Sequence, residues 1–405
     1  MATDDYTIRQ LTADDLEAFS GVLATAFLAD GELEKIIDAE RTVFEPERSV
    51  AVVADGRFAG VGQILSRAVT LPGGRICPMA AVTSVGVRPD HRRRGVLTRI
   101  MRAQLHGLHE SGAEPIAALW ASEAAIYGRF GYGLATDYVR HEISARTPFR
   151  PGVDLGTDRV REVPRAEAMA VIRPIYERYA AATVGALGRT EPHWNYHLLD
   201  SEHRRRGASP FRFAVHPDGY AVYRVKGEWS DRAPNGRVMV RELVATTPES
   251  YAALMRYLLD VDLIGVIEYD GGPDEPLSLL LQTPRAALRR RFDGMFIRLV
   301  DLDRGLTARD YAADVDVVMD VADEFCPWNA GRWRFVAKDG DAVVERTTAD
   351  ADLSLSTTEL SAAYLGGPRL TSLAAAGRVR GTPAAVARLS AAFQSEREPA
   401  CVEVF

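Results

Sequence analysis

A short arginine-containing loop between an apolar segment and a helical one could bind a phosphate or pyrophosphate. The apolar segment is Val82-Thr83-Ser84-Val85-Gly86-Val87, and Arg92-Arg93-Arg94-Gly95 follows it closely. The helix that we predict after Gly95 leaves backbone N–H groups without acceptors in its first turn, where the helix dipole also favours an anion. Gly95 permits close approach of the backbone to a ligand, and the arginines add charge-assisted donors. The alternative is a solvated basic loop that opens a surface helix.

The five-residue sequence His91-Arg92-Arg93-Arg94-Gly95 occurs again as His203-Arg204-Arg205-Arg206-Gly207. We expect a different role for this second copy. Here the basic run ends a predicted helix that begins near His193, so it complements the negative end of that helix. In this half of the chain, the position that corresponds to the first loop is Val244–Ser250. Its Pro248 removes a donor and its Glu249 would repel a pyrophosphate, so we predict no second cofactor site.

Two further segments carry groups that could transfer protons. The segment Trp120–Gly133 places Tyr127 in a predicted short helix between a strand end and a Phe-Gly-Tyr turn. The last five residues are Cys401-Val402-Glu403-Val404-Phe405, an alternating pattern that predicts a strand with a buried end. A phenol has an ordinary pKa of ~10, and an α-carboxylate has one of ~3.5. The alternatives are a core tyrosine packed on the helix after Gly95 and an edge strand that completes a sheet.

The elements that must position these residues alternate between strand and helix. The dipeptide Asp55-Gly56 predicts a hairpin between the apolar segments 49–54 and 58–66. After Gly95, apolar residues recur at spacings of three and four, the period of an amphipathic helix. Residues 146–156 contain two prolines and two glycines, which is typical of a linker. We predict an α/β (α+β) chain with domains at residues 1–148, 149–295 and 296–405.

Composition narrows the class of protein further. The 405 residues include 49 Lys and Arg and 56 Asp and Glu, which gives a net charge of −7. This balance excludes a protein that coats nucleic acid by charge alone and weakly favours cationic partners. The polar, acidic N-terminal segment lacks the pattern of a signal peptide, and the apolar runs are too short to span a bilayer. The cysteines Cys77, Cys326 and Cys401 are far apart, so we expect reduced thiols, no metal site and a soluble cytoplasmic protein.

Taken together, these segments resemble the Eis (enhanced intracellular survival) family of GCN5-related N-acetyltransferases. The most specific match is the run from Ala121 to Gly133, which reads ASEAAIYGRFGYG. The loop reads Arg92-x-x-Gly95-x-Leu97, with leucine where the wider acetyltransferase pattern has Gly or Ala. The resemblance covers essentially the whole chain. It implies two tandem acetyltransferase folds, the second degenerate, followed by a sterol-carrier-like domain, and assembly as a homohexamer.

The resemblance also implies an activity and roles for individual residues. The donor is acetyl-coenzyme A, and the acceptors are amines of cationic small molecules, notably aminoglycosides. Tyr127 donates a proton to the leaving coenzyme A thiolate, and the main-chain carboxylate of Phe405 is the general base of a direct transfer that needs no metal. The residues expected to contact the cofactor are Val85, Gly86, Val87, Arg93, Arg94, Gly95, Val96, Leu97, Thr98, Ser122 and Glu123.

The acceptor side is less clearly marked in the sequence. We expect Asp30, which lies near Glu32 and Glu34 after the first helix, to attract cations, and we place Ser84 and Trp194 beside the acceptor. A solvated acidic loop and ordinary core packing are the alternatives for Asp30 and Trp194. Two other functions stay open. One is acetylation of protein or peptide lysines, and the other is a lipid-binding or regulatory role without catalysis.

Overall fold

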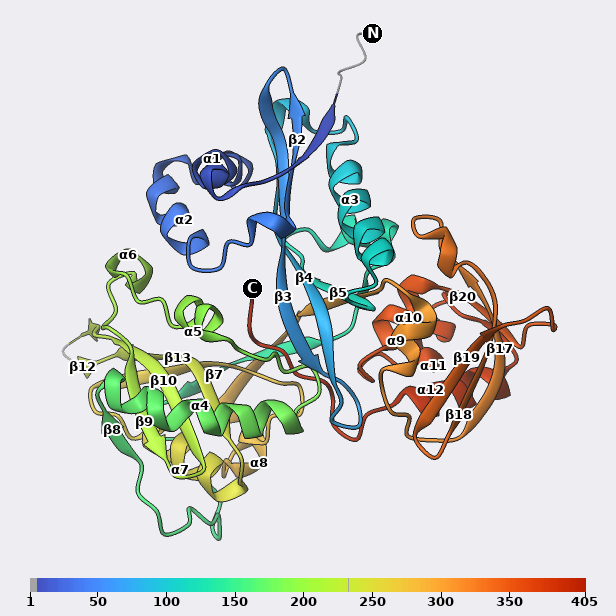
Figure 1. Ribbon diagram of the computed structural model, residues 1–405. Coiled ribbons are helices and arrows are strands. Elements are labelled where there is room, and N and C mark those ends of the chain that lie inside the picture. Colours follow the sequence, from blue (N-terminus) through green and yellow to red (C-terminus); the bar gives the residue numbers. More distant parts are fainter. Residues whose placement is uncertain (1–5, 232) are drawn as a thin grey trace.

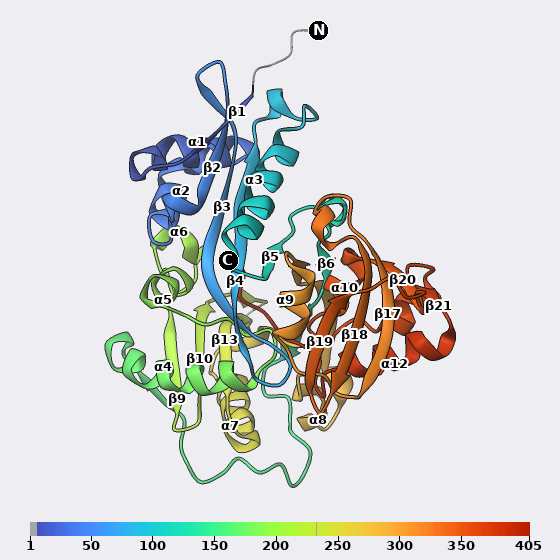
Figure 2. The same cartoon turned by 45° about the vertical axis from the view of Figure 1, so that its right-hand side comes forward.

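The computed structural model describes residues 6–231 and 233–405, except for the side chain of Asp30. The chain forms three lobes, and a long hairpin of the first lobe extends downward between the other two (Figure 1). The view turned by 45° shows the same arrangement (Figure 2). Both views place the C-terminus near the centre of the molecule, beside this hairpin.

The first lobe is a seven-stranded sheet with helices on its faces. Its strands, in spatial order, are β1 (Thr7–Gln10), β2 (Ser49–Ala54), β3 (Arg57–Thr70), β4 (Ile76–Val87), β5 (Ile116–Trp120), β16 (Met295–Leu299) and β6 (Gly133–Leu134). Its helices are α1 (Leu16–Ala26), α2 (Leu33–Glu40) and α3 (Val96–Ser111), with a 3-10 helix at Ala124–Phe130. The predicted hairpin joins β2 to β3. Asp55 and Gly56 adopt φ values of +50° and +73° there, as a two-residue turn of this kind requires.

The second lobe repeats this plan around another seven-stranded sheet. Its strands, in spatial order, are β15 (Ala287–Asp293), β7 (Asp137–Ser144), β14 (Ile264–Gly271), β13 (Gly236–Ala245), β10 (Gly219–Lys226), β9 (Arg212–His216) and β8 (Arg161–Val163). Its helices are α4 (Arg165–Ala182), α5 (Glu191–His197), α6 (Glu202–Arg205), α7 (Pro248–Leu259) and α8 (Leu277–Leu280), and a short ribbon pairs β11 (Trp229–Ser230) with β12 (Ala233–Pro234). The single helix predicted from His193 to Arg206 is therefore two helices. The second one ends at the basic run, where Arg206 and Gly207 have positive φ.

The two sheets exchange strands at their common boundary. β7 precedes the predicted linker in sequence, yet it pairs with β14 and β15 of the second sheet. β16 follows the second unit in sequence, yet it pairs with β5 and β6 of the first sheet. The second sheet therefore takes β7 from the predicted range 1–148, and the first sheet takes β16, which begins where the predicted ranges 149–295 and 296–405 meet.

The third lobe packs helices against a five-stranded sheet. The strands, in spatial order, are β19 (Asp341–Arg346), β18 (Gly331–Lys338), β17 (Val315–Ala322), β20 (Leu353–Ser356) and β21 (Arg380–Gly381). The helices are α9 (Leu302–Thr307), α10 (Thr357–Ala363), α11 (Leu370–Ala375) and α12 (Pro383–Phe393). The lower half of the β3–β4 hairpin shares a hydrophobic core with this lobe, and Phe405 belongs to that core. Burial of this apolar surface fixes the third lobe and the end of the chain against the first sheet.

Candidate active site

The N-terminus of α3 opens directly from the arginine-containing loop. Gly95 precedes the helix with φ +80°, and Arg93 also has a positive φ of +61°. The first backbone hydrogen bond of the helix runs from the Arg99 N–H to the Gly95 carbonyl, so the N–H groups of residues 96–98 have no acceptor within the helix. Gly95 has no side chain that could cap them. Arg93 and Arg94 are exposed beside this turn, which suits a pyrophosphate.

The corresponding helix of the second lobe differs at this point. The Thr247 hydroxyl accepts a hydrogen bond of 3.1 Å from the Ser250 N–H and so caps α7. Pro248 occupies the first helical position, where it supplies no N–H. The two copies of the fold thus present different helix N-termini, one open and one already capped.

The strand β4 diverges from β5 close to the loop. Among the described residues, the parallel pairing of the two strands covers Met79–Ala81 and ends there. A bulge follows, in which Gly62 of β3 lies opposite both Ser84 and Val85. Ser84 has φ +50°, a conformation that costs a non-glycine residue about 1 kcal/mol or more and is found preferentially at functional sites. Beyond the bulge, Gly86 and Val87 pair with β3, and residues 85–87 have no ladder partner on the β5 side among the described residues.

Tyr127 lies a short distance along the chain after β5. Ser122 and Glu123 are exposed just after the end of β5, and Tyr127 follows in the 3-10 helix, half-buried. Its ring contacts that of Tyr132 edge-on, with centroids 6.0 Å apart. Tyr127 packs against the same hydrophobic cluster as Val85, Val87 and Leu97. Burial raises the pKa of the Tyr127 phenol, so the group stays protonated at neutral pH and can act as a proton donor.

The tail, residues Cys401–Phe405, brings its last residue to the bulge. The Thr83 hydroxyl donates a hydrogen bond of 2.9 Å to the main-chain oxygen of Phe405. The tail is not the strand that the alternating pattern predicts, because it forms no β-ladder among the described residues. The side chains of the tail nevertheless alternate between buried and more exposed positions. Cys401, Glu403 and Phe405 are buried, whereas Val404 is 52% exposed.

A carboxylate that the sequence did not mark lies beside the tail. Glu40, the last residue of α2, accepts a hydrogen bond of 2.9 Å from the Ser84 hydroxyl. Thr83 points to the same side of the sheet, because its partner Gln63 donates to the carbonyl of Val43, just after α2. Burial raises the pKa of Glu40 to about 7 against the opposing effects of Ser84 and Arg204. Consecutive residues of the bulge therefore hold Glu40 and the main chain of Phe405.

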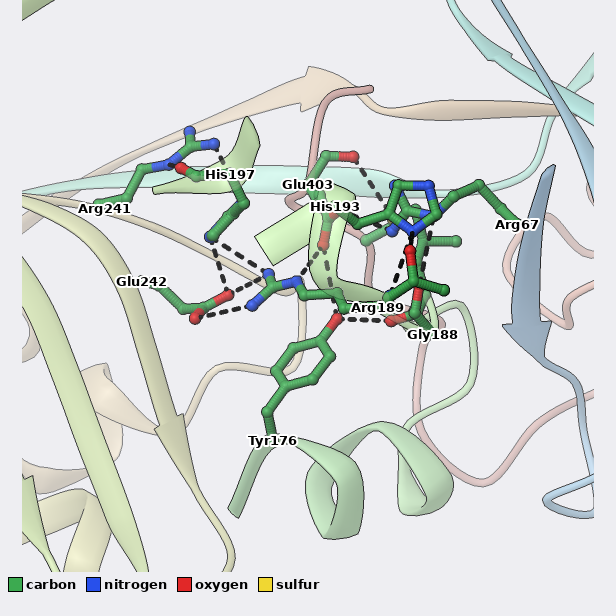
Figure 3. A network of polar contacts seen from close by, with 12 residues as sticks. Arg67, Tyr176, Gly188, Arg189, His193, His197, Arg241, Glu242 and Glu403 are labelled. Carbon is green, nitrogen blue, oxygen red and sulfur yellow. Dashed lines mark hydrogen bonds and ion pairs between the residues drawn. The ribbon is translucent and has the colours of Figure 1, made fainter. Parts of the chain in front are cut away.

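A buried network of charges surrounds the tail (Figure 3). Glu403 pairs with Arg67 of β3 at 2.6 Å and with Arg189 of the second lobe at 2.8 Å. Arg189 also pairs with Glu242 of β13, which accepts a hydrogen bond of 2.6 Å from Tyr220. Burial raises the pKa of the Glu403 carboxyl, but Arg189 and Arg67 outweigh this effect and hold it well below its ordinary range.

Trp194 lies in a different environment from the one expected, and the expectation for Asp30 stays a prediction. Trp194 is 4% exposed in the core of the second lobe, where its ring packs on Tyr176 and under the guanidinium of Arg189. The structure therefore gives it the core-packing role, because an indole between these groups has little surface left for a ligand. The side chain of Asp30 lies outside the described part of the structure. Ser84, the third predicted acceptor residue, lies at the bulge.

Two general properties concern metals and membranes. In the described ranges, no group of three His, Cys, Asp or Glu side chains is arranged to hold a metal ion. No helix in the same ranges is both long and apolar enough to cross a membrane. Cys77, Cys326 and Cys401 are buried free thiols.

Family models match three parts of the chain. Residues 7–135 and residues 185–299 each match an acetyltransferase (GNAT) domain. Residues 302–402 match a sterol carrier protein domain. The tandem acetyltransferase folds and the third, sterol-carrier-like domain that the sequence predicted are thereby confirmed.

Relatives match over nearly the full length. The chain is 35% identical to the N-acetyltransferase Eis of Mycobacterium tuberculosis over 391 residues, which are 93% of this chain and 94% of the relative. An uncharacterized N-acetyltransferase of Streptomyces avermitilis is 40% identical over 98% of both chains. The crystal structure of Eis1 from Mycobacterium abscessus superimposes with a TM-score of 0.84 and 32% identity, over 99% of this chain and 100% of that one. The chain belongs to the Eis family of GNAT N-acetyltransferases, and it is an acetyltransferase.

Proposed function

We propose that this acetyltransferase transfers the acetyl group of acetyl-coenzyme A to an amine of a cationic small molecule, with aminoglycosides as the first class of acceptor. The observation that carries the proposal is the hydrogen bond from Thr83 to the main-chain oxygen of Phe405. It brings a terminal carboxylate to the bulge of β4, where the adjacent Ser84 contacts the half-buried Glu40. Two carboxylates at this point favour a cation as the acceptor.

The donor is bound by the first lobe alone in this proposal. The N–H groups of residues 96–98, with Arg93 and Arg94, hold the pyrophosphate of coenzyme A. Its pantetheine arm lies along Val85, Gly86 and Val87, where β4 has left β5. Ser122 and Glu123, which follow the end of β5, lie on the opposite side of this arm. The capped N-terminus of α7 supports a single donor site for each chain.

The chemical step is a direct transfer. The acceptor nitrogen loses a proton to the Phe405 carboxylate, directly or through water, and attacks the thioester carbonyl. Backbone N–H groups of residues 85–87 stabilise the negative charge on the carbonyl oxygen. The carbon–sulfur bond then breaks, and the coenzyme A thiolate takes the proton of Tyr127, since a phenol and a thiol have comparable pKa values. The proton that Phe405 received returns to the Tyr127 phenolate through solvent, which restores both groups.

The assembly and location follow the family resemblance. We propose a homohexamer in the cytoplasm, and sedimentation analysis of the purified chain tests the first point. Acetylation of lysine side chains is the second candidate function, because a lysine also presents a primary amine to the same carboxylates.

The test uses acetyl-coenzyme A and a panel of amines, with release of free thiol as the readout. The panel contains kanamycin, neomycin, spermidine and a lysine-containing peptide. Turnover with the aminoglycosides that exceeds turnover with the peptide is the expected result. An absence of thiol release with every amine would overturn the proposal, and turnover with the peptide alone would favour the second candidate.

A further inference from the structure

The two sides of the tail have different surroundings, a cavity on one side and a network of ion pairs on the other. Ala400 and Val402 line a cavity of about 910 Å³ at the junction of the three lobes, so packed side chains do not hold the tail there. The start of the tail is fixed by a backbone hydrogen bond of 2.9 Å from Ala400 to Val184. From that point to Phe405, the side chains of Cys401 and Phe405 pack in the apolar core, and Glu403 between them makes the charged contacts.

Glu403 makes its contacts with two different lobes. Its Oε1 atom lies 2.6 Å from Nη2 of Arg67, and its Oε2 atom lies 2.8 Å from Nε of Arg189. The three side chains are 8%, 2% and 1% exposed. Both carboxylate oxygens are therefore engaged in water-excluded, charge-assisted hydrogen bonds, which are short and directional.

The second lobe holds Arg189 rigidly on its other edge. Arg189 pairs with Glu242 through both terminal nitrogens, and its guanidinium lies 3.8 Å from the ring centre of Tyr176. Burial lowers the pKa of the neighbouring His197 to about 4, so this ring is neutral at physiological pH. Arg67 and Arg189 thus form a single binding position for one carboxylate of the tail, which Glu403 occupies.

This arrangement specifies the register of the tail. A slip by one residue would put Val402 or Val404 against the two arginines and leave the buried Arg67 without a carboxylate and Arg189 with Glu242 alone, which is strongly unfavourable for Arg67. Phe405 follows Glu403 by two residues, about 7 Å along an extended chain. A fixed Glu403 therefore limits where the end of the chain can lie.

We propose that Glu403 is a positioning residue that fixes the main-chain carboxylate of Phe405 at Thr83, and that the second acetyltransferase-like lobe serves the reaction by holding Glu403 through Arg189. This inference rests on the proposed role of the Phe405 carboxylate. The inference gives a function to the second lobe, in which Thr247 already caps the N-terminus of α7. The ion pairs of Glu403 set the register together with the apolar packing of Cys401 and Phe405 on either side of it.

A double-mutant cycle tests the inference in the full-length chain. The first change is Glu403→Gln, and the second is one glycine appended after Phe405, which moves the carboxylate away from Thr83. Mass spectrometry first verifies that the parent protein ends at Phe405. For each protein, kcat and KM for acetyl-coenzyme A and for kanamycin are measured together with the thermal midpoint.

The inference predicts that each change lowers kcat on the order of 10²-fold, as a displacement of about 1 Å does in other active sites. KM for acetyl-coenzyme A stays unchanged, because the donor site contains neither group. The combined variant is no slower than the extended one, since a carboxylate that is already displaced needs no positioning. Losses that multiply would overturn the inference. An extended protein with full activity would instead overturn the proposed role of the Phe405 carboxylate itself.

A charge-balanced variant covers the case in which Glu403→Gln does not fold. Arg67→Gln with Glu403→Gln removes one charge of each sign and leaves Arg189 paired with Glu242. Its matched control is Arg48→Gln with Glu114→Gln, an ion pair of the same 2.6 Å length in the first lobe. The control lowers the thermal midpoint but keeps kcat, and its effect combines independently with the extension. An equal loss of kcat in both pairs would contradict the inference.

Discussion

The hydroxyl of Thr83 and the main-chain oxygen of Phe405 form a hydrogen bond of 2.9 Å across 322 positions of sequence. It joins β4 of the first lobe to the last residue of the third lobe. Because Ser84, the next residue, donates a hydrogen bond to Glu40, adjacent residues of β4 contact both groups that we propose to face the acceptor.

Replacing Thr83 with valine keeps the shape of the side chain and removes the donor. We expect kcat to fall about 5-fold to 10-fold, the usual effect of losing one hydrogen bond of about 1 kcal/mol. Thr83→Ser retains the hydroxyl and recovers most of the activity. Steady-state assays of thiol release check this, and a Thr83→Val enzyme as fast as the parent would show that the contact has no part in the reaction.

Tyr127→Phe removes the proposed proton donor. The expected loss in kcat is about 10²-fold to 10⁴-fold, the range for general acid catalysis, with KM for acetyl-coenzyme A unchanged. Because burial raises the pKa of Tyr127, the parent keeps its activity up to and beyond pH 10, the ordinary range of tyrosine.

Tyr132→Phe is the matched control for this change. Tyr132 is 1% exposed, and its hydroxyl has no hydrogen-bond partner in the described part of the chain. Removing that hydroxyl leaves kcat unchanged and does not lower stability. Similar losses of kcat in both phenylalanine variants would argue that the Tyr127 change acts through packing.

Gly95→Ala tests the loop at the start of α3. The residue has φ +80°, so alanine there costs about 1 kcal/mol of stability. It also puts a methyl group where the pyrophosphate must approach, and we expect KM for acetyl-coenzyme A to rise about 10-fold. Gly207→Ala, at φ +81° after the second arginine run, has the same backbone cost and no described atom within 4 Å of the new methyl group. Its KM stays at the parental value, and an equal rise in both variants would contradict the assignment of the loop.

Glu40→Gln tests the raised pKa of the carboxyl group beside Ser84 through its effect on the free energy of unfolding. Its pKa of about 7 in the folded chain lies above the ordinary value near 4.3. The unfolded chain therefore gives up this proton at a lower pH than the folded chain does, and the folded state loses stability as the pH rises from about 4.3 to 7. The glutamine variant avoids this loss, so its free energy of unfolding exceeds that of the parent by about 3–4 kcal/mol at pH 8 and by about 1 kcal/mol at pH 5. Urea unfolding of the parent and the variant at pH 5 and pH 8 measures this difference in free energy. The same difference at both pH values would show that Glu40 titrates normally.

Short-range features of the site could be predicted from the sequence because they depend on neighbouring residues. The hairpin at Asp55-Gly56, the open helix start after Gly95 and the short helix of Tyr127 all belong to this class. The exchange of β7 and β16 could not be predicted, since it depends on which sheet edges meet in space. Glu40 has the sequence context of a solvated helix end, and only its contact with Ser84 reveals its burial.

Glu403 illustrates the same limit at longer range. The alternating pattern of the tail predicts a strand with a buried end, but it does not show which charges pair with Glu403. Its partners Arg67 and Arg189 are 336 and 214 residues away. Trp194 was ambiguous for a related reason, because a tryptophan at a helix start suits a pocket wall and a core equally well.

The central claim is that the main-chain carboxylate of Phe405 takes part in the transfer. The most direct measurement compares single-turnover acetylation of kanamycin by the parent chain and by the chain with one glycine added after Phe405. The account predicts a rate on the order of 10²-fold lower for the extended chain, with acetyl-coenzyme A bound equally well by both. An extended chain that acetylates kanamycin at the parental rate would contradict it.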